Sequence, residues 1–220
     1  MPKKEIALAL AVVVSTSLPL FAGTVNGTVL TKPATRQNQA WYPIPREFEL
    51  APGGYQAKIV VRDKNSGRIG TLVHEFEVPA LGPFRISTPV LSDTLQPAPT
   101  GEKAGTPQPT LLARRSFAPG SMLLAQFEVY GAGKEKATGM PQVTAGYEVR
   151  RTDGTMVTHV DPTRIQPTSL GRLMRLMGTK IEDWPAGDYE MVFNLKDEIA
   201  GKTIEVKEPF AVVAAGPGAL

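Results

Sequence analysis

The sequence holds few side chains of the kind that carry out chemistry. Its 2 histidines are His74 and His159, and it has no cysteine, which excludes thiol nucleophiles, disulfide bonds and thiolate metal sites. Asp153 and Asp161 flank His159 in the sequence, but Asp153 precedes a glycine in a typical hairpin turn, and the three lack the spacing of a metal-ligand set. Because no nucleophile elbow or phosphate-binding loop occurs either, we expect no enzymatic activity, no cofactor and no bound metal.

Trp41 and Tyr42 are the candidate ligand contacts. These adjacent aromatic residues lie beside Pro43 and Pro45, in a segment that we expect to form a loop. Rings exposed in a loop could stack on a sugar, and the same rings could instead cover one end of a packed domain. We favour the second role, because scattered aromatic residues usually pack, and we keep a glycan-binding site as the alternative.

The sequence contains one phrase twice. The segments LAPGGYQAKIVVRD (residues 50–63) and WPAGDYEMVFNLKD (residues 184–197) align at their tyrosines, and the same offset of 134 residues extends the match into the following strand. The identities fall on turn glycines and at strand ends, where backbone geometry restricts the choice of residue, so we interpret the match as a repeated structural unit. The identical pairs are Gly53 and Gly187, Tyr55 and Tyr189, Asp63 and Asp197, Gly67 and Gly201, Phe76 and Phe210, and Val78 and Val212.

Each copy of the repeat predicts a β-hairpin. From Tyr189 onward apolar and polar side chains alternate, except at Val192, which is the period of a strand with one buried face. Gly201 then allows a turn with positive φ before the return strand. A tyrosine two residues after a glycine, at the start of a core strand, resembles the tyrosine corner of immunoglobulin-like sandwiches. Since Asp63 and Asp197 belong to separate hairpins, we expect each to cap its own turn and not to form a catalytic pair.

Composition and pattern together predict an all-β protein. The chain has 20 prolines and 21 glycines, too many for a helical bundle and too dispersed for a low-complexity chain. Its 220 residues, 42% of them hydrophobic, can build two cores. We predict two tandem immunoglobulin- or fibronectin-III-like β-sandwich domains, at residues 24–90 and 109–214, the first short enough to be incomplete. Residues 91–108 are a proline-rich linker and residues 215–220 a tail in this scheme.

The first 23 residues have the pattern of a secretory signal peptide. Lys3 and Lys4 precede an apolar run at residues 6–14, and cleavage near Ala22 or Gly23 would release a mature chain to the periplasm or the outside. The run is too short to cross a bilayer, so we expect no stable membrane span after processing. The alternative is that residues 6–20 form a strand of the first domain and that the chain is cytoplasmic.

Charge argues against nucleic acid as a partner. The chain has 24 basic and 21 acidic residues, a formal net charge of +3, and no long basic block. Such a balanced distribution cannot form the basic stripe that neutralises phosphates.

Three segments carry a resemblance to a known family. LAPGGYQAKIVVRDKNSGRIGTLVHEFEVPAL, ISTPVLSD and RRSFAPGSMLLAQFEVY resemble the C-terminal region of von Willebrand factor A-related proteins of soil bacteria such as acidobacteria, over roughly residues 46–213. The resemblance implies tandem immunoglobulin-like β-regions in an exported protein. Because the chain has no DxSxS metal-adhesion motif, it implies a scaffold without the A domain and its metal site.

These observations lead to one expected function and one alternative. We expect a non-enzymatic, exported scaffold or protein-interaction module of the bacterial cell envelope, whose partner is a protein of the envelope or the extracellular space. The alternative is a glycan-binding β-sandwich module that uses Trp41 and Tyr42.

Overall fold

The computed structural model describes residues 48–63, 66–96, 108–112, 114–168 and 170–214, together with the backbone pairing of residues 7–16 and 22–30. In these ranges the chain is all-β and contains no helix, so none is long and apolar enough to cross a membrane. Its contacts divide it into two units between Ala80 and Leu81.

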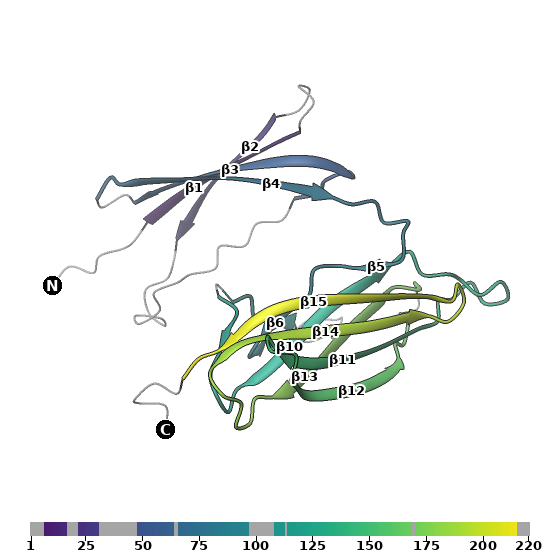
Figure 1. Ribbon diagram of the computed structural model, residues 1–220. Helices are drawn as coiled ribbons and strands as arrows, with labels where there is room; N and C mark the ends of the chain where they lie inside the picture. The colour runs from purple at the N-terminus through teal and green to yellow at the C-terminus, as the bar shows by residue number, and fades with distance from the viewer. Residues whose placement is uncertain are drawn as a thin grey trace. The chain divides into compact units, whose positions relative to one another are not determined.

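The first unit is one antiparallel sheet. Its strands are β1 (Ala7–Thr16), β2 (Ala22–Leu30), β3 (Gly53–Asp63) and β4 (Ile69–Val78), in the spatial order β2-β1-β3-β4 (Figure 1). Ala57 in the middle of β3 is buried, whereas Leu72 and Val73 on β4 are 58% and 57% exposed. Among the described residues of this unit no second sheet covers the first, so the sandwich predicted at residues 24–90 is a single sheet there.

The second unit has two main sheets. The larger has the order β12-β11-β14-β15-β9, and the smaller has the order β13-β10-β5, with β6 also paired to β10. In Figure 1, β15, β14, β11 and β12 lie side by side, and β10 and β13 pass behind them at an angle. The bounds are β5 Arg85–Ile86, β6 Val90–Ser92, β7 Leu95–Gln96, β8 Gln108–Pro109, β9 Ser116–Phe117, β10 Met122–Tyr130, β11 Val143–Arg151, β12 Met156–Arg164, β13 Leu173–Lys180, β14 Gly187–Asp197 and β15 Lys202–Val212.

A continuous apolar core joins these two sheets. Phe127 of β10 meets Phe193 of β14 edge to face, with ring centroids 5.3 Å apart. Tyr147 of β11 reaches across to β13, where its hydroxyl donates a 2.9 Å hydrogen bond to the carbonyl of Gly178. The alternation read from the sequence therefore sorts the side chains of β14 correctly, since Tyr189, Met191, Phe193 and Leu195 are all at most 2% exposed.

The boundary between the units lies earlier than the sequence predicts. Residues 85–92 were expected to end the first domain and begin the linker, but β5 and β6 pair with β10 of the second unit. Leu91 and Ser92 are buried, and the Ser92 hydroxyl lies 2.8 Å from the carbonyl of Thr110. Proline-rich composition predicts an exposed connection, but it does not reveal that a short strand within it completes a sheet. Residues 97–107 and the tail 215–220 lie outside the described residues.

The repeated hairpin has the same register in both units. Tyr55 pairs with Phe76, and Tyr189 pairs with Phe210, and the rings of each pair stack at 5.8 Å and 5.6 Å. At the strand ends, Gly53 pairs with Val78 and Gly187 pairs with Val212. The two turns also match, because Gly67 and Gly201 have φ values of 71° and 66°, which glycine adopts without strain.

The structural repeat is larger than the sequence repeat. Asp63 lies opposite Leu8 of β1, and Asp197 lies opposite Val143 of β11, so β1 pairs with β3 as β11 pairs with β14. In addition, β2 pairs with β1 as β12 pairs with β11. The four-stranded sheet β2-β1-β3-β4 is therefore a second copy of β12-β11-β14-β15, although the sequence match covers only the last two strands of each.

The tyrosine hydroxyls make equivalent bonds in the two copies. Tyr55 donates to the carbonyl of Ala51 at 2.8 Å, and Tyr189 donates to that of Pro185 at 2.6 Å. The burial differs, since Tyr55 is half-buried and Tyr189 is 1% exposed. Trp184 stacks on Tyr189 at 5.7 Å and belongs to the margin of the core.

Tyr189→Ala should lower the free energy of unfolding of the second unit by roughly 3–5 kcal/mol, because it empties a large, fully packed aromatic site. Tyr55→Ala, the matched change in the first unit, should cost less because that ring is only half-buried. Denaturant unfolding followed by circular dichroism measures both. A loss at Tyr189 no greater than that of Lys196→Ala, a change at an exposed position, would contradict the assignment.

Candidate functional site

The structure describes only some of the residues that the sequence singles out. Trp41 and Tyr42 are outside the described residues, so their prediction stays untested. His74 and His159 are both exposed, and the imidazole of His74 stacks on Phe76 with the ring centres 6.0 Å apart.

The candidate site that the structure does offer is a hollow on the outer face of the larger sheet of the second unit. It consists of two adjoining depressions of about 200 and 560 Å³, which share Pro162 and Asn194. We call this surface the outer-face hollow. It lies over β12, β11, β14 and β15, on the side turned away from the core.

Gly146 lies beside the hollow, where β12 passes close to β11. The register between β11 and β12 shifts between Ala145 and Tyr147, which is a β-bulge that brings the two backbones close together. A Cβ atom on Gly146 would lie 2.6 Å from the carbonyl oxygen of Val160 and 2.7 Å from the nitrogen of Pro162. Glycine is therefore required here, because the backbone of β12 fills the space that a side chain would take.

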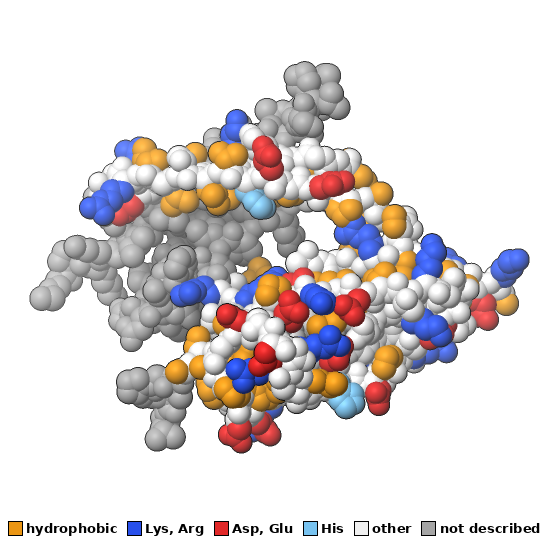
Figure 2. Space-filling model, viewed as in Figure 1, with side chains coloured by type: hydrophobic (Ala, Val, Ile, Leu, Met, Phe, Trp, Pro, Cys, Tyr) orange, Lys and Arg blue, Asp and Glu red, His pale blue; other side chains and the backbone are white. Residues whose placement is uncertain are grey.

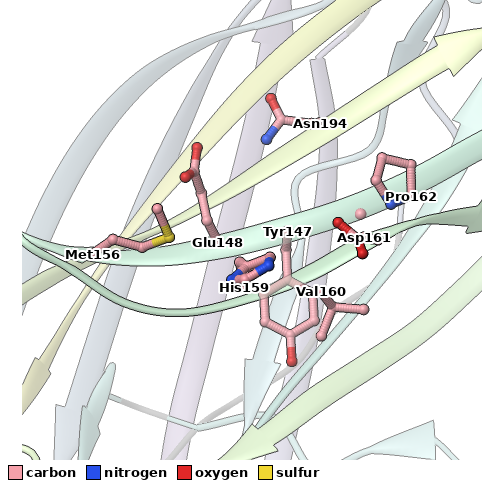
Figure 3. Close-up of a pocket in the computed structure, with 9 residues that line it drawn as sticks. Tyr147, Glu148, Met156, His159, Val160, Asp161, Pro162 and Asn194 are labelled. Carbon is pink, nitrogen blue, oxygen red and sulfur yellow. The ribbon is translucent and has the colours of Figure 1, made fainter.

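The polar side chains of the hollow come from neighbouring strands. Glu148 and Asn194 project to one side of the strands, while the ring of Tyr147 projects to the other, into the core (Figure 3). His159 lies opposite Glu148 in the pairing of β11 and β12. The hollow therefore presents a carboxylate, an amide and an imidazole to a ligand, whereas its one tyrosine ring is turned inward.

The charged groups around the hollow are paired. Glu148 forms an ion pair with Arg150, and Lys196 lies 2.6 Å from Glu198. The hydrogen bond from Lys196 lowers the pKa of Glu198 below its ordinary value, and a 3.1 Å bond from the Thr144 hydroxyl adds to this effect. The carboxylate of Glu198 is therefore ionised at neutral pH and suits recognition of polar or cationic groups.

Val192 shows how closely this face is covered elsewhere. It breaks the alternation of β14 and points away from the core, yet it is 0% exposed. Glu148 and Lys207 lie directly on either side of it in the sheet register. The long stems of charged residues shield apolar surface in this way.

The repeated aspartates bind backbone groups. Asp197 is 0% exposed, and its carboxylate accepts hydrogen bonds from the N–H groups of Ile199 and Ala200 at 3.0 Å and of Gly133 at 2.6 Å. The Asp63 carboxylate accepts a 2.6 Å bond from the Ser66 hydroxyl in its own turn. Each aspartate therefore belongs to its own hairpin, as the sequence suggested.

Asp153 and Asp161 are likewise separate from a metal-binding arrangement. The Asp153 carboxylate accepts a 2.9 Å bond from the N–H of Thr155, which caps the turn and lowers the pKa of the aspartate. Within the part of the chain that the structure describes, no group of three or more histidine, aspartate or glutamate side chains could hold a metal ion.

The outer-face hollow had only a faint signal in the sequence. An isolated glycine inside a strand, as in VTAGYEVRR, indicates a bulge or a close backbone approach. Which strand approaches Gly146 depends on the pairing of β11 with β12, and this pairing follows from the hairpin turn at Asp153 and Gly154. The hollow could have been suspected from the glycine, but its lining by β14 and β15 could not.

Comparison with known proteins adds no relative. No protein-family model matches the chain, and no curated protein matches it.

Stability should depend on pH through Asp197. Burial alone would raise the pKa of this carboxyl group, but its three backbone hydrogen bonds and nearby Lys202 outweigh burial and hold the pKa below the ordinary value. A lowered folded-state pKa gives stabilisation that is complete above the unfolded pKa, about 3.9, and is lost as pH falls through the folded-state pKa.

Asp197→Asn should therefore lower the free energy of unfolding at pH 7 by roughly 1.5–3 kcal/mol, the contribution of hydrogen bonds to a charged group. The difference from the unsubstituted chain should shrink as pH falls below about 4. Urea unfolding over a pH series measures this difference, and Asp188→Asn, at an exposed position of β14, is the control. A difference that stays constant with pH would show that packing, and not charge, is what the substitution removes.

Proposed function

We propose that this chain is a non-enzymatic scaffold or protein-interaction module of the bacterial cell envelope. The observation that carries the proposal is the repeated hairpin, β3-β4 and β14-β15, which offers strand surfaces and turns for contact and does not include residues 1–22. Binding residues of proteins are disproportionately found in exposed loops and turns that a rigid scaffold holds.

An immunoglobulin-like identity of the units is part of the proposal. It is supported by the equivalent tyrosine bonds, Tyr55 to Ala51 and Tyr189 to Pro185, which have the form of a tyrosine corner. The sandwich-like packing of the second unit around Phe127 and Phe193 supports it further. The first unit would be one sheet of such a domain.

The resemblance to the C-terminal region of von Willebrand factor A-related proteins points in the same direction. It rests on segments that include the repeated hairpin and the strand from Met122. We propose that the chain shares the scaffold role that this resemblance implies, without the A domain and its metal site. The outer-face hollow is then a secondary contact surface for a polar segment of a partner.

The proposed location is the periplasm or the outside of the cell, and it rests on the N-terminal pattern of Lys3 and Lys4 followed by an apolar run. In the full-length chain Ala7–Thr16 forms strand β1, between β2 and β3. Cleavage near Ala22 or Gly23 would remove β1, so export and a strand role for these residues lead to different mature proteins.

Cell fractionation with intact-mass measurement tests the location. We expect the chain in the periplasmic or secreted fraction, shortened by its first 22 or 23 residues, because the signal-like segment is removed on export. Full-length chain in the cytosol would instead establish residues 6–20 as a strand and exclude an envelope function. Substituting Lys3 and Lys4 by glutamate, which removes the positive n-region, should retain the precursor inside the cell.

A glycan pull-down separates the scaffold from its alternative. Purified chain should not be retained on peptidoglycan, cellulose or chitin, because the proposed surfaces contact protein. Retention that is lost in a Trp41→Ala, Tyr42→Ala double variant would identify the chain as a glycan-binding module. Tyr130→Ala, an aromatic substitution in the second unit, is the matched control.

A further inference from the structure

Strand β4 is an outer strand whose edge is open. It pairs with β3 on one side, and no other described strand pairs with it. Ile69, Leu72 and Val73 are 64%, 58% and 57% exposed, and they lie on both faces of the strand. Figure 2 shows hydrophobic side chains at several points along this sheet. A long, exposed, apolar edge strand is a template for pairing with another strand.

The hairpin determines which backbone groups of β4 point toward β3 and which point outward. The N–H of Asp63 donates to the carbonyl of Arg68 at 2.9 Å, so these two residues form a hydrogen-bonded pair. In an antiparallel ladder such pairs alternate with pairs whose backbone groups point outward. The N–H and C=O groups of Thr71, Val73 and Glu75 therefore point away from β3.

In the second unit the equivalent strand, β15, has a partner along part of its outer edge. Ala211 of β15, the counterpart of Glu77, donates its outward N–H to the carbonyl of Arg115 at 2.9 Å, beside strand β9. Phe117 of β9 is 1% exposed and packs edge to face on Phe210. Phe76, the counterpart of Phe210, is only half-buried.

Beyond β9, the edge of β15 is blocked in a way that β4 is not. At the outward-pointing positions β15 carries Lys207 and Pro209, whereas β4 carries Val73 and Glu75 at the matching positions. A proline has no N–H to offer, and an edge lysine resists burial, so both are common devices against strand addition. The glutamate at position 75 retains its outward N–H.

The opposite edge of the larger sheet is also protected. Strand β12 contains Pro162 and two register shifts against β11. Its Thr163 hydroxyl bonds to the guanidinium of Arg175 at 2.5 Å, which ties β12 to the outer strand β13 of the other sheet. Within the part of the chain that the structure describes, both edges of the larger sheet are thus protected against strand addition, whereas the outer edge of β4 is not.

The charge pattern of β4 favours a second copy of itself, in the antiparallel direction. Arg68 precedes the strand, uncharged residues fill positions 69–73, and Glu75 and Glu77 lie in the second half. Antiparallel pairing centred on Val73, with outward-pointing Thr71 opposite outward-pointing Glu75, sets the acidic half of each strand beside the Arg68 end of the other. Parallel pairing in register would instead set glutamate beside glutamate, which is destabilising.

We propose that the chain forms a twofold-symmetric dimer in which β4 of one copy pairs antiparallel with β4 of another, centred on Val73. The two four-stranded sheets then form one continuous sheet across the symmetry axis. This inference deepens the proposed scaffold function, since it names the contact surface and the partner. It concerns the chain that keeps residues 7–16, because β1 pairs with β3 and its loss would leave β3 and β4 as an isolated hairpin.

Sedimentation analysis of the full chain over a concentration series tests the proposal. The unsubstituted protein should convert from a 23.6 kDa species to one of twice that mass. Glu75→Pro should weaken self-association at least about tenfold, since each strand loses one outward N–H. The hairpin should survive this change, because β15 already carries Pro209 at the matching position.

Two control variants separate backbone pairing from other effects. Glu75→Gln removes the same charge but keeps the N–H, and it should still dimerise. Val73→Lys copies Lys207 of β15 at the edge and should weaken the dimer, whereas Val60→Lys, on the same face of β3 but one strand inward, should not. If Glu75→Pro lowers the melting temperature of the first unit, Val73→Lys and Val60→Lys provide the test instead, because they differ only in whether the lysine lies on the edge strand.

Hydrogen exchange supplies the readout specific to an edge contact. The amides of Thr71, Val73 and Glu75 should exchange more slowly as protein concentration rises, while those of Leu72 and His74, which face β3, should not change. A chain that stays monomeric, a dimer unaffected by Glu75→Pro, or protection without this alternation would each overturn the proposal. None of these results would decide the scaffold function, which depends on the fractionation and glycan experiments.

Discussion

The packing of Phe127 against Phe193 holds together the two sheets of the second unit, and most of that unit follows from it. For the rings to meet, β10 and β14 must each turn one full face toward the other sheet. That requirement fixes the register of every strand beside them, since a slip of one residue would carry the apolar face to the solvent. Gly178 of β13 lies very close to β10, because a Cβ atom there would be only 2.6 Å from the carbonyl oxygen of Leu123. A residue with a side chain could not take this place in the sheet.

Burial of charge sets a second condition on the same unit. Asp197 lies at the end of a strand that is otherwise apolar on its inner face, and an unpaired carboxylate there would be costly. The turn after β14 and the loop at Gly133 supply the N–H donors, so the hairpin and a loop distant in sequence are fixed by one side chain. Glu208, another mostly buried acid, forms an ion pair with Arg115 beside β9.

The two units show that one sheet can serve two purposes. The copies share strand order, register, turn glycines and the tyrosine bond, yet only one has a second sheet over its inner face among the described residues. Their side chains differ accordingly, with Met191 and Phe193 in the covered copy where the other has Ala57 and Ile59. The residues at the sheet edge also differ, since only the copy in the second unit has Lys207 and Pro209, which disfavour pairing with a further strand. Among the described residues, the repeated backbone thus forms one sheet that a second sheet covers and one that no second sheet covers.

The sequence by itself determined the local geometry of this protein. Alternation predicted β3 and β14, the glycines at 67 and 201 predicted the turns, and the identical offset predicted that the two hairpins would match, because these properties depend on residues close together in the chain. The role of Asp197 in its turn was accessible for the same reason. Tertiary structure alone decided that β5 and β6 join the second unit, that β1 and β2 repeat β11 and β12 without a matching sequence, and that Gly146 and Asn194 line the same hollow. Each of these features depends on which strand, distant in the sequence, pairs with a given strand. Many apolar sequences are compatible with the same pairing, so the sequence of one strand does not identify its neighbour. Strand order and edge exposure are therefore properties of the assembled sheets.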